Sequence, residues 1–178
     1  MNQGNTVPSV TFKTRVRDDS IGGDNPFKWQ DLTTDEIFNN RRVVLFSLPG
    51  AFTPTCSTFQ VPGFEQQHEE ICAKGVDDIY VLSVNDTFTM RKWMLDQKVE
   101  KLKFIPDGNG DFTDKMNMLV DMRAVGFGWR SRRYAMIVAN GVIEQMFVEP
   151  DSSAADPDPY GVSSPESVMT YLNRHEAK

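Results

Sequence analysis

The stretch "RRVVLFSLPGAFTPTCSTFQVPGF", residues 41–64, joins an apolar segment to a segment of helical character. Its first eight residues form an apolar run with β-branched side chains, which ends at Pro49 and predicts a buried strand. The residues after Cys56 predict a helix that ends at Gly75 and is kinked at Pro62. A single thiol therefore stands where a strand gives way to a helix.

Strand and helix patterns alternate on either side of this stretch. Further strands are predicted from Val10, over 78–84 and over 101–108. Two more strands flank Asn140-Gly141, the preferred residue pair for a two-residue hairpin turn. Helices are predicted near Thr34, after Asp86, over 110–119 and over 164–175.

This order predicts one domain over residues 1–178, with residues 1–6 as a loose tail. Alternating strands and helices favour parallel crossovers, and the hairpin adds antiparallel strands, so the sheet is mixed. We expect an α/β, three-layer sandwich of the thioredoxin-like type with N-terminal additions. A doubly wound sheet is the structural alternative.

Composition excludes several classes of function. The net charge of −6 disfavours binding to nucleic acid or to anionic membranes. No apolar run approaches the ~20 residues of a membrane span, and the N-terminus has no secretory signal. Two cysteines in 178 residues are not a disulfide framework, so we expect a cytoplasmic protein.

Metal and cofactor sites are not expected either. The two cysteines and two histidines are too far apart in the sequence for a zinc site. The stretch "DGNGD", residues 107–111, begins like a calcium loop, but Phe112 and Met118 stand where that loop needs glycine and glutamate. It therefore predicts a turn.

The place of Cys56 favours a reactive thiol. A helix N-terminus presents unpaired N–H groups and a partial positive charge, which stabilise a thiolate. The hydroxyl of Thr53 can both accept and donate a hydrogen bond, and Pro49 and Pro54 stiffen the loop. The alternative is a buried, inert cysteine beside a threonine that caps the helix.

A family resemblance bears on this choice. Residues 49–56, "PGAFTPTC", match the P-x-x-x-T-x-x-C motif of the peroxiredoxins, in the form typical of their type II, peroxiredoxin-5-like branch. Further stretches resemble that branch: "VPGFE", "KGVDDIYVLSVND", "FIPDGNGDFT" and "RRYAMIVANGVIEQMFVEP". The resemblance implies a thiol peroxidase that reduces hydrogen peroxide and alkyl hydroperoxides through a cysteine sulfenic acid.

The resemblance also assigns roles to site residues. Cys56 would attack the peroxide, Thr53 would orient it, and Pro49 would shield the site. The N–H groups of Thr55 and Cys56 would bind a peroxide oxygen. The family's arginine precedes an aromatic residue at the start of the hairpin, which makes it Arg133.

Alternation along a strand places Arg133 and its neighbour Arg132 on opposite faces, so only one of them can reach the site. The family match selects Arg133, whose guanidinium stays charged in a partly dry pocket. The alternative for Arg133 is a surface salt bridge.

The usual resolving cysteine is missing, because Val81 occupies its place in this branch. Cys72 lies 16 residues after Cys56, which is ~24 Å along a straight helix, whereas a disulfide needs Cα atoms within roughly 7 Å. We therefore interpret Cys72 as structural. An external thiol is then required, with glutathione and glutaredoxin preferred and thioredoxin as the alternative. The resemblance also implies a homodimer.

Two competing functions and two weaker signals remain. A thioredoxin-type thiol–disulfide reductase needs a second nearby cysteine, and a redox sensor or holdase would not turn over with a reductant.

His68 is ~18 Å from Cys56 along a helix and cannot serve as its base, and His175 is expected to be exposed. Phe52, Phe127 and Trp129 form either an apolar rim, a dimer contact or part of the core.

Overall fold

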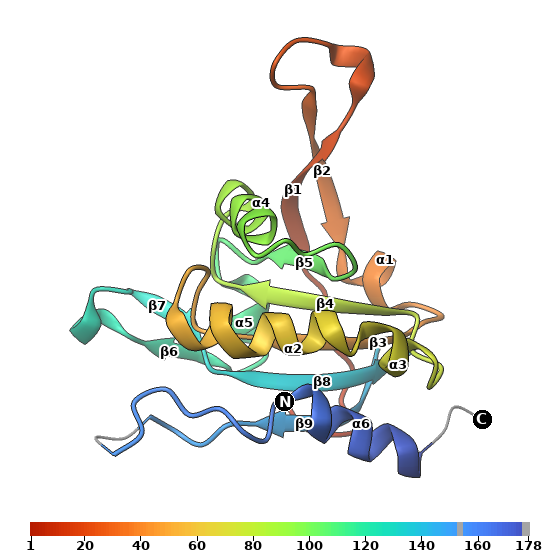
Figure 1. Ribbon diagram of the computed structural model, residues 1–178, viewed down its shortest axis with the longest axis vertical. Helices are drawn as coiled ribbons and strands as arrows, with labels where there is room; N and C mark the ends of the chain where they lie inside the picture. The colour runs from red at the N-terminus through yellow and green to blue at the C-terminus, as the bar shows by residue number, and fades with distance from the viewer. Residues whose placement is uncertain (153–154, 176–178) are drawn as a thin grey trace.

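Helices cover both faces of a central sheet in the computed structural model, which describes residues 1–152 and 155–175 (Figure 1). The α-helices are α1 (Thr34–Phe38), α2 (Val61–Gln66), α3 (His68–Cys72), α4 (Thr87–Asp96), α5 (Asp111–Lys115) and α6 (Pro165–Arg174). Shorter turns are the 3-10 helices η1 (Asp19–Ile21) and η3 (Arg123–Val125) and the π-helix η2 (Cys56–Gln60).

The apolar run of the opening stretch becomes β3 (Arg42–Ser47), the middle strand of a five-stranded sheet. On one side β3 pairs in parallel with β4 (Asp78–Ser83), and β4 pairs in parallel with β5 (Lys103–Pro106). On the other side β3 pairs antiparallel with β8 (Tyr134–Ala139), which forms the hairpin with β9 (Val142–Val148). The predicted mixed sheet is confirmed, and its antiparallel half rules out the doubly wound alternative.

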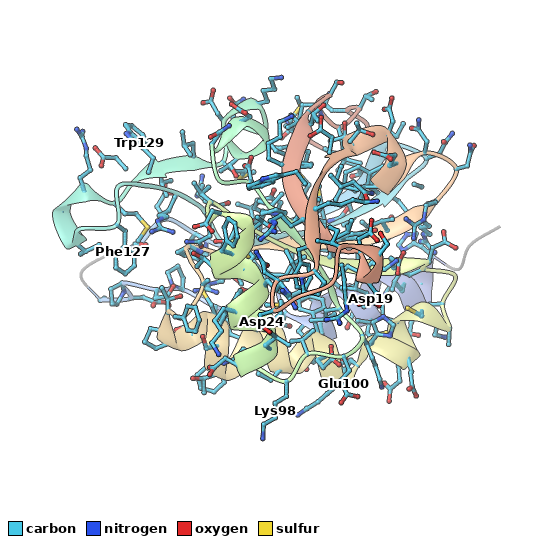
Figure 2. All side chains as sticks on the ribbon, turned by 90° about the horizontal axis from the view of Figure 1, so that it is seen from above. Asp19, Asp24, Lys98, Glu100, Phe127 and Trp129 are labelled. Atoms are coloured by element: carbon cyan, nitrogen blue, oxygen red, sulfur yellow. The ribbon has the colours of Figure 1, made fainter. Side chains whose placement is uncertain are left out.

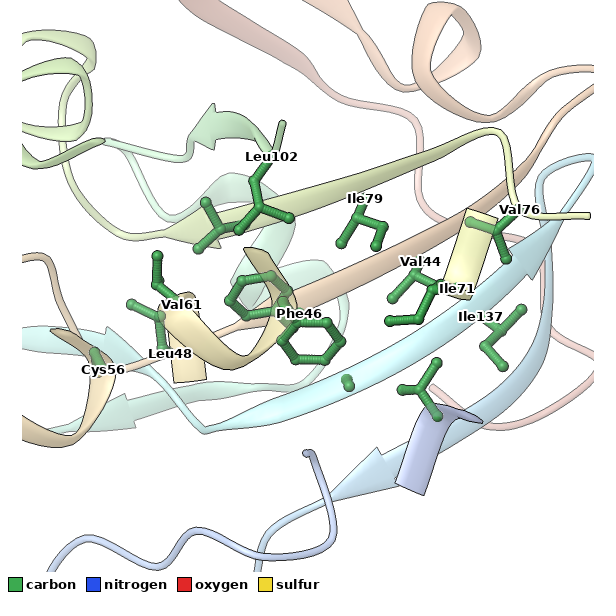
Figure 3. Packing of buried hydrophobic residues seen from close by; sticks show 14 of the residues in the cluster. Val44, Phe46, Leu48, Cys56, Val61, Ile71, Val76, Ile79, Leu102 and Ile137 are labelled. Atoms are coloured by element: carbon green, nitrogen blue, oxygen red, sulfur yellow. The ribbon is translucent and has the colours of Figure 1, made fainter. Parts of the chain in front are cut away.

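Each face of β3 enters its own core. Val44 and Phe46 face a cluster that includes residues of α2, α3, α4 and α6, and Figure 3 shows this packing. Val43 and Leu45 face the opposite cluster, with residues of α1 and α5. Because successive side chains of a strand alternate between faces, β3 is buried on both sides. These layers form the predicted three-layer, thioredoxin-like sandwich.

The N-terminal region holds a strand that the sequence pattern did not predict. β1 (Thr11–Arg17) pairs antiparallel with β2 (Phe27–Thr33) in a sheet of its own, which projects beyond α4 in Figure 1. β2 is mostly exposed, so no clear apolar alternation marked it. The Arg15 guanidinium lies 5.7 Å from the Trp29 ring centroid and 5.2 Å from that of Phe88, which fastens this hairpin to α4.

Residues 1–6 are not the predicted loose tail. Thr6 forms a β-bridge with Val142, and the N–H of Gly4 donates to the carbonyl of Ile143 at 2.8 Å. The N–H of Val7 likewise donates to the carbonyl of Gly141 at 2.9 Å. The prediction was wrong because the edge strand β9 offers unpaired backbone groups that the short polar segment satisfies.

A second small ribbon also differs from the prediction. The helix expected over 110–119 ends at Lys115, and β6 (Leu119–Asp121) pairs with β7 (Trp129–Ser131). Asn117 adopts a left-handed conformation with φ of 57°, which stops the helix. The helix therefore stops before Asn117, although the composition of residues 110–119 is typical of a helix.

Phe64 tests the packing of α2 against β3. Its ring stacks on that of Phe46 with centroids 4.2 Å apart, and both side chains are fully buried. We expect Phe64→Ala to lower the free energy of unfolding by about 3–5 kcal/mol, because it leaves a cavity between helix and sheet. Urea denaturation measures this loss.

The matched control is Phe59→Ala, in which the same atoms are removed from an exposed ring of the preceding turn. This change should stay within about 0.5 kcal/mol of the parent protein. Equal effects of the two substitutions would contradict the packing described for α2.

Candidate active site

The loop between β3 and the helix is held by its own polar groups. The Thr53 hydroxyl donates to the Gly50 carbonyl at 2.7 Å, and the Ala51 N–H donates to Asn85 Oδ1 at 3.0 Å. Phe52 adopts a left-handed conformation with φ of 64°, which turns the chain sharply toward the helix. The Thr53 hydroxyl therefore keeps its oxygen available as an acceptor.

The start of the helix supplies backbone donors beside the thiol. The Ser57 N–H donates to the Thr53 carbonyl at 3.1 Å, the spacing of an α-helical bond. The N–H groups of Thr55 and Cys56 precede that bond, so they belong to the unpaired first turn. Cys56 itself is fully buried.

The helical segment changes from a π-helix to an α-helix at Val61, and it does not break at Pro62. Cys56 begins the π-helical turn η2, in which the Val61 N–H donates to the Cys56 carbonyl. Pro62 is the second residue of α2 and directly follows this π-turn. The break comes later, at Gln67 with φ of −90° and ψ of 5°, and the helical run ends at Cys72, before Gly75. The wide π-turn accommodates the proline.

Arg133 makes the contact that defines the site. Its Nη1 lies 3.3 Å from Cys56 Sγ and donates to Gln60 Oε1 at 2.6 Å. The residue is only 4% exposed, and its Nε–H has no hydrogen-bond partner among the described residues. A buried cation thus faces the thiol with one donor unused.

Electrostatics keep Arg133 charged despite its burial. Burial, the largest influence, acts to lower the pKa of Arg133, but a negative charge on Cys56 and the Asp158 carboxylate together raise it above its ordinary value. The guanidinium is therefore a fixed positive charge against the sulfur.

The neighbouring arginine points elsewhere. Arg132 pairs with the exposed Asp151 at 2.7 Å and donates to the Glu149 carbonyl at 3.4 Å. The structure therefore places Arg133, not Arg132, against Cys56. Arg133 does form an ion pair, with Asp158 at 2.5 Å, but its side chain is buried, so the surface salt bridge alternative does not describe it.

Sequence reasoning missed the residues that surround Arg133. Gln60 follows Cys56 by four residues, a spacing that places both on one face of a helix and could have revealed it. Glu149 begins a Pro/Ser/Asp loop and Asp158 lies within it, and this loop has no periodicity, so no local signal marked either residue. Glu149 accepts from the N–H groups of Gly161 and Ser163 at 2.7 and 2.8 Å and closes that loop.

Known proteins share this sequence and this fold. A redoxin family model matches residues 2–161. A peroxiredoxin from Rhizobium etli is 54% identical over 175 residues, which cover 97% of each chain. The chain belongs to the redoxin family, as a peroxiredoxin. This confirms the family predicted from the motif.

Two further relatives match the peroxiredoxin over almost all of its length. The hybrid peroxiredoxin hyPrx5 of Haemophilus influenzae is 49% identical, over 96% of this chain and 66% of its own. The crystal structure of the Plasmodium falciparum antioxidant protein, a 1-Cys peroxiredoxin, superposes with a TM-score of 0.87 at 37% identity. That match covers 97% of this chain and 100% of the other. The family activity, thiol-dependent reduction of peroxides, is the activity of this chain.

A cavity of about 470 Å³ opens beside the site of the peroxiredoxin. Pro49 and Arg133 both line it, so two of the predicted site residues share one hollow. Val120, Met122 and Val125 form an apolar part of its wall, and the loop that begins at Glu149 forms another part. Thr53 and Thr55 belong to the adjoining loop and first helical turn.

The second cysteine of the peroxiredoxin lies at the other end of the helical run. Cys72 is the last residue of α3, its thiol is free, and it lies 3.8 Å from the His68 ring. Burial, with a smaller effect of Asp77, raises the pKa of Cys72 above its ordinary value. His68 thus neighbours Cys72 and not Cys56, and His175 is exposed, as predicted.

The three aromatic residues considered as a rim lie on the surface of the molecule. Phe52, Phe127 and Trp129 are 52%, 39% and 51% exposed, which excludes the core packing alternative. Figure 2 shows Phe127 and Trp129 at the periphery, near the β6–β7 ribbon. The rim and dimer-contact interpretations both fit this exposure.

Two features are absent from residues 1–152 and 155–175. This part of the chain holds no group of three or more metal-ligating side chains, and none of its helices is long and apolar enough to cross a bilayer. The segment "DGNGD" forms the predicted turn. In it Asp107 accepts from the N–H groups of Phe112 and Thr113 and starts α5.

Glu149 gives a pH-dependent test of the loop. Burial alone would raise the pKa of Glu149, but hydrogen bonds from Gly161 and Ser163 lower it below its ordinary value of 4.5. Ionised Glu149 thus adds stability above about pH 4.5 that is lost as the pH falls below that value. We expect Glu149→Gln to be less stable than the parent at pH 7, with the gap narrowing at acidic pH. Urea unfolding across this pH range measures it.

The control for this test is Glu100→Gln, which neutralises an exposed glutamate. Its stability should follow that of the parent protein at every pH. A gap for Glu149→Gln that stays constant from pH 7 to acidic pH would contradict the role given to the ionised carboxylate.

Proposed function

We propose that this peroxiredoxin reduces hydrogen peroxide and alkyl hydroperoxides, with Cys56 as the attacking nucleophile. The observation that carries the proposal is the 3.3 Å contact between Arg133 Nη1 and Cys56 Sγ in a buried setting. The thiolate is the nucleophilic form of a cysteine, and a fixed cation in contact with the sulfur orients it toward a substrate. The apolar wall of the neighbouring cavity suits the carbon chain of an alkyl hydroperoxide.

The first chemical step forms a sulfenic acid. The Cys56 thiolate attacks one oxygen of the peroxide, an S–O bond forms, and the O–O bond breaks. The departing oxygen leaves as hydroxide or alkoxide and takes up a proton, which gives water or an alcohol. The sulfur is oxidised and the peroxide is reduced by two electrons.

The other site residues act on the peroxide. The Thr53 oxygen, whose hydrogen is bonded to Gly50, accepts a hydrogen bond from the peroxide O–H. The N–H groups of Thr55 and Cys56 and the unused Nε–H of Arg133 stabilise negative charge on the peroxide oxygens. Pro49 shields the thiolate from bulk water.

An external thiol completes the cycle. Glutathione attacks the sulfenic acid, releases water and leaves a mixed disulfide on Cys56, and a second thiol, delivered with glutaredoxin, frees Cys56 as a thiol. Thioredoxin is the alternative donor. The raised pKa of Cys72 and its place at the far end of the helical run favour a one-cysteine mechanism.

The proposal extends to the setting of the enzyme. We place it in the cytoplasm as a homodimer, with exposed aromatic residues beside the site available for the contact. Its acidic net charge disfavours nucleic acid and membrane surfaces as partners. No cofactor takes part in the proposed cycle.

The two cysteines have separable effects on turnover. Cys56→Ser should abolish the consumption of hydrogen peroxide, because the nucleophile is lost. Cys72→Ser should keep full turnover with glutathione and glutaredoxin, because Cys72 takes no part. Steady-state peroxide consumption, run in parallel with thioredoxin as donor, measures both; a collapse of turnover in Cys72→Ser would instead make Cys72 the resolving cysteine.

Arg133 should matter for the rate of peroxide attack. We expect Arg133→Ala to lower the second-order rate constant with hydrogen peroxide by about 100- to 1,000-fold, because the cation facing the sulfur is lost. It should also lower the fraction of Cys56 that iodoacetamide alkylates at pH 7. Arg132→Ala, which removes the neighbouring charge, should react at nearly the parent rate. A full rate in Arg133→Ala would remove Arg133 from the mechanism.

A further inference from the structure

Arg133 carries a third contact that the proposed chemistry does not use. Its Nη2 donates to Asp158 Oδ1 at 2.5 Å, while Nη1 serves Cys56 and Gln60. We propose that Asp158 is the positioning residue that holds the Arg133 guanidinium against Cys56 and balances its charge. This inference rests on the proposed roles of Cys56 and Arg133.

The guanidinium is held from two sides. Gln60, from the π-helical turn, fixes Nη1 at 2.6 Å, and Asp158, from the loop before α6, fixes Nη2 at 2.5 Å. The Tyr160 ring lies 5.8 Å from the guanidinium carbon, which adds a cation–π contact. With both ends fixed, the planar group has one orientation toward the sulfur.

The loop that carries Asp158 is itself anchored. Glu149 Oε1 accepts from the Gly161 N–H, the Ser163 N–H and the Ser163 hydroxyl, at 2.7, 2.8 and 2.8 Å. The Ser163 hydroxyl oxygen also accepts from Gln60 Nε2 at 3.4 Å. The two groups that hold Arg133 are therefore joined through one loop stem.

Charge gives Asp158 a second effect. The charged and titratable groups around Arg133 are the Cys56 thiol, the Asp158 carboxylate and the Tyr160 phenol, with Glu149 near Tyr160. Burial, with Glu166 adding a smaller effect, raises the pKa of Tyr160 to about 12, so it stays neutral. The negative charge of Asp158 therefore offsets part of the electrostatic attraction between Arg133 and a Cys56 thiolate. Removing that carboxylate should leave the full charge of Arg133 to act on Cys56.

Two substitutions separate position from charge. Asp158→Ala removes both the hydrogen-bond acceptor and the charge, whereas the amide oxygen of Asp158→Asn still accepts from Nη2. Both are made with Cys72→Ser, so that iodoacetamide reports on Cys56 alone. The measurements are the second-order rate constant with hydrogen peroxide and the pH profile of alkylation.

The position of the Arg133 guanidinium should determine the rate constant with hydrogen peroxide, and the charge of Asp158 should determine the pH profile of Cys56 alkylation. Asp158→Ala should slow the reaction with hydrogen peroxide by about 10- to 100-fold, because the Arg133 guanidinium is no longer held in one orientation toward Cys56. Asp158→Asn should stay within about fivefold of the parent rate. It should also shift the alkylation profile to lower pH, because the thiolate gains the undivided charge of Arg133.

Asp31→Asn is the control. It also removes an ion-paired carboxylate, but one that lies in the N-terminal hairpin, pairs with Lys13 and is 57% exposed. It should change neither measurement.

The inference is overturned if Asp158→Ala and Asp158→Asn both behave like Asp31→Asn. It is also overturned if both are slowed equally while the alkylation profile stays unmoved, because the effect would then not act through Arg133. A parent protein that reduces hydrogen peroxide no faster than Cys56→Ser would instead refute the proposed function, which is a separate result.

Discussion

A buried guanidinium against a buried sulfur is the constraint on which the site depends. Arg133 is almost fully enclosed, and a charge in such a place persists only when it is paired and hydrogen bonded. β8 starts directly after Arg133, the helix that begins near Cys56 supplies the sulfur and Gln60, and the loop after β9 supplies Asp158. Three segments far apart in the sequence therefore meet at one cation.

The central sheet explains why these segments meet. β3 and β8 are neighbouring antiparallel strands, with Ser47 opposite Tyr134 at the end of the pairing. The carboxyl end of β3, which leads to Cys56, therefore lies at the same end of the sheet as Arg133, the residue just before β8. β9 is antiparallel to β8, so it also finishes at that end of the sheet, and the chain then enters the loop that carries Asp158. This order of strands brings the Cys56 thiol, the Arg133 guanidinium and the Asp158 carboxylate to one end of the sheet.

Much of this arrangement was predictable from local patterns. The apolar run of β3, the Asn140-Gly141 turn and the motif around Cys56 each carry their own signal, and the choice of Arg133 followed from the family match and strand alternation. Asp158 and Glu149 had no such signal, because their role depends on contacts between distant segments. The same holds for β2 and for residues 1–6, whose partners are set by the folded chain and not by their own apolar pattern.

The strand-like attachment of residues 4–7 has a consequence for how copies of the chain can meet. At the start of β9, the carbonyls of Ile143 and of Gly141 in the preceding turn already accept from Gly4 and Val7, and the N–H of Ile143 donates to Asn5. An edge whose amides are engaged within the molecule offers no template for a strand from a neighbour. The first residues of the chain thus cover the start of β9 and block the pairing of a strand from another molecule at that position.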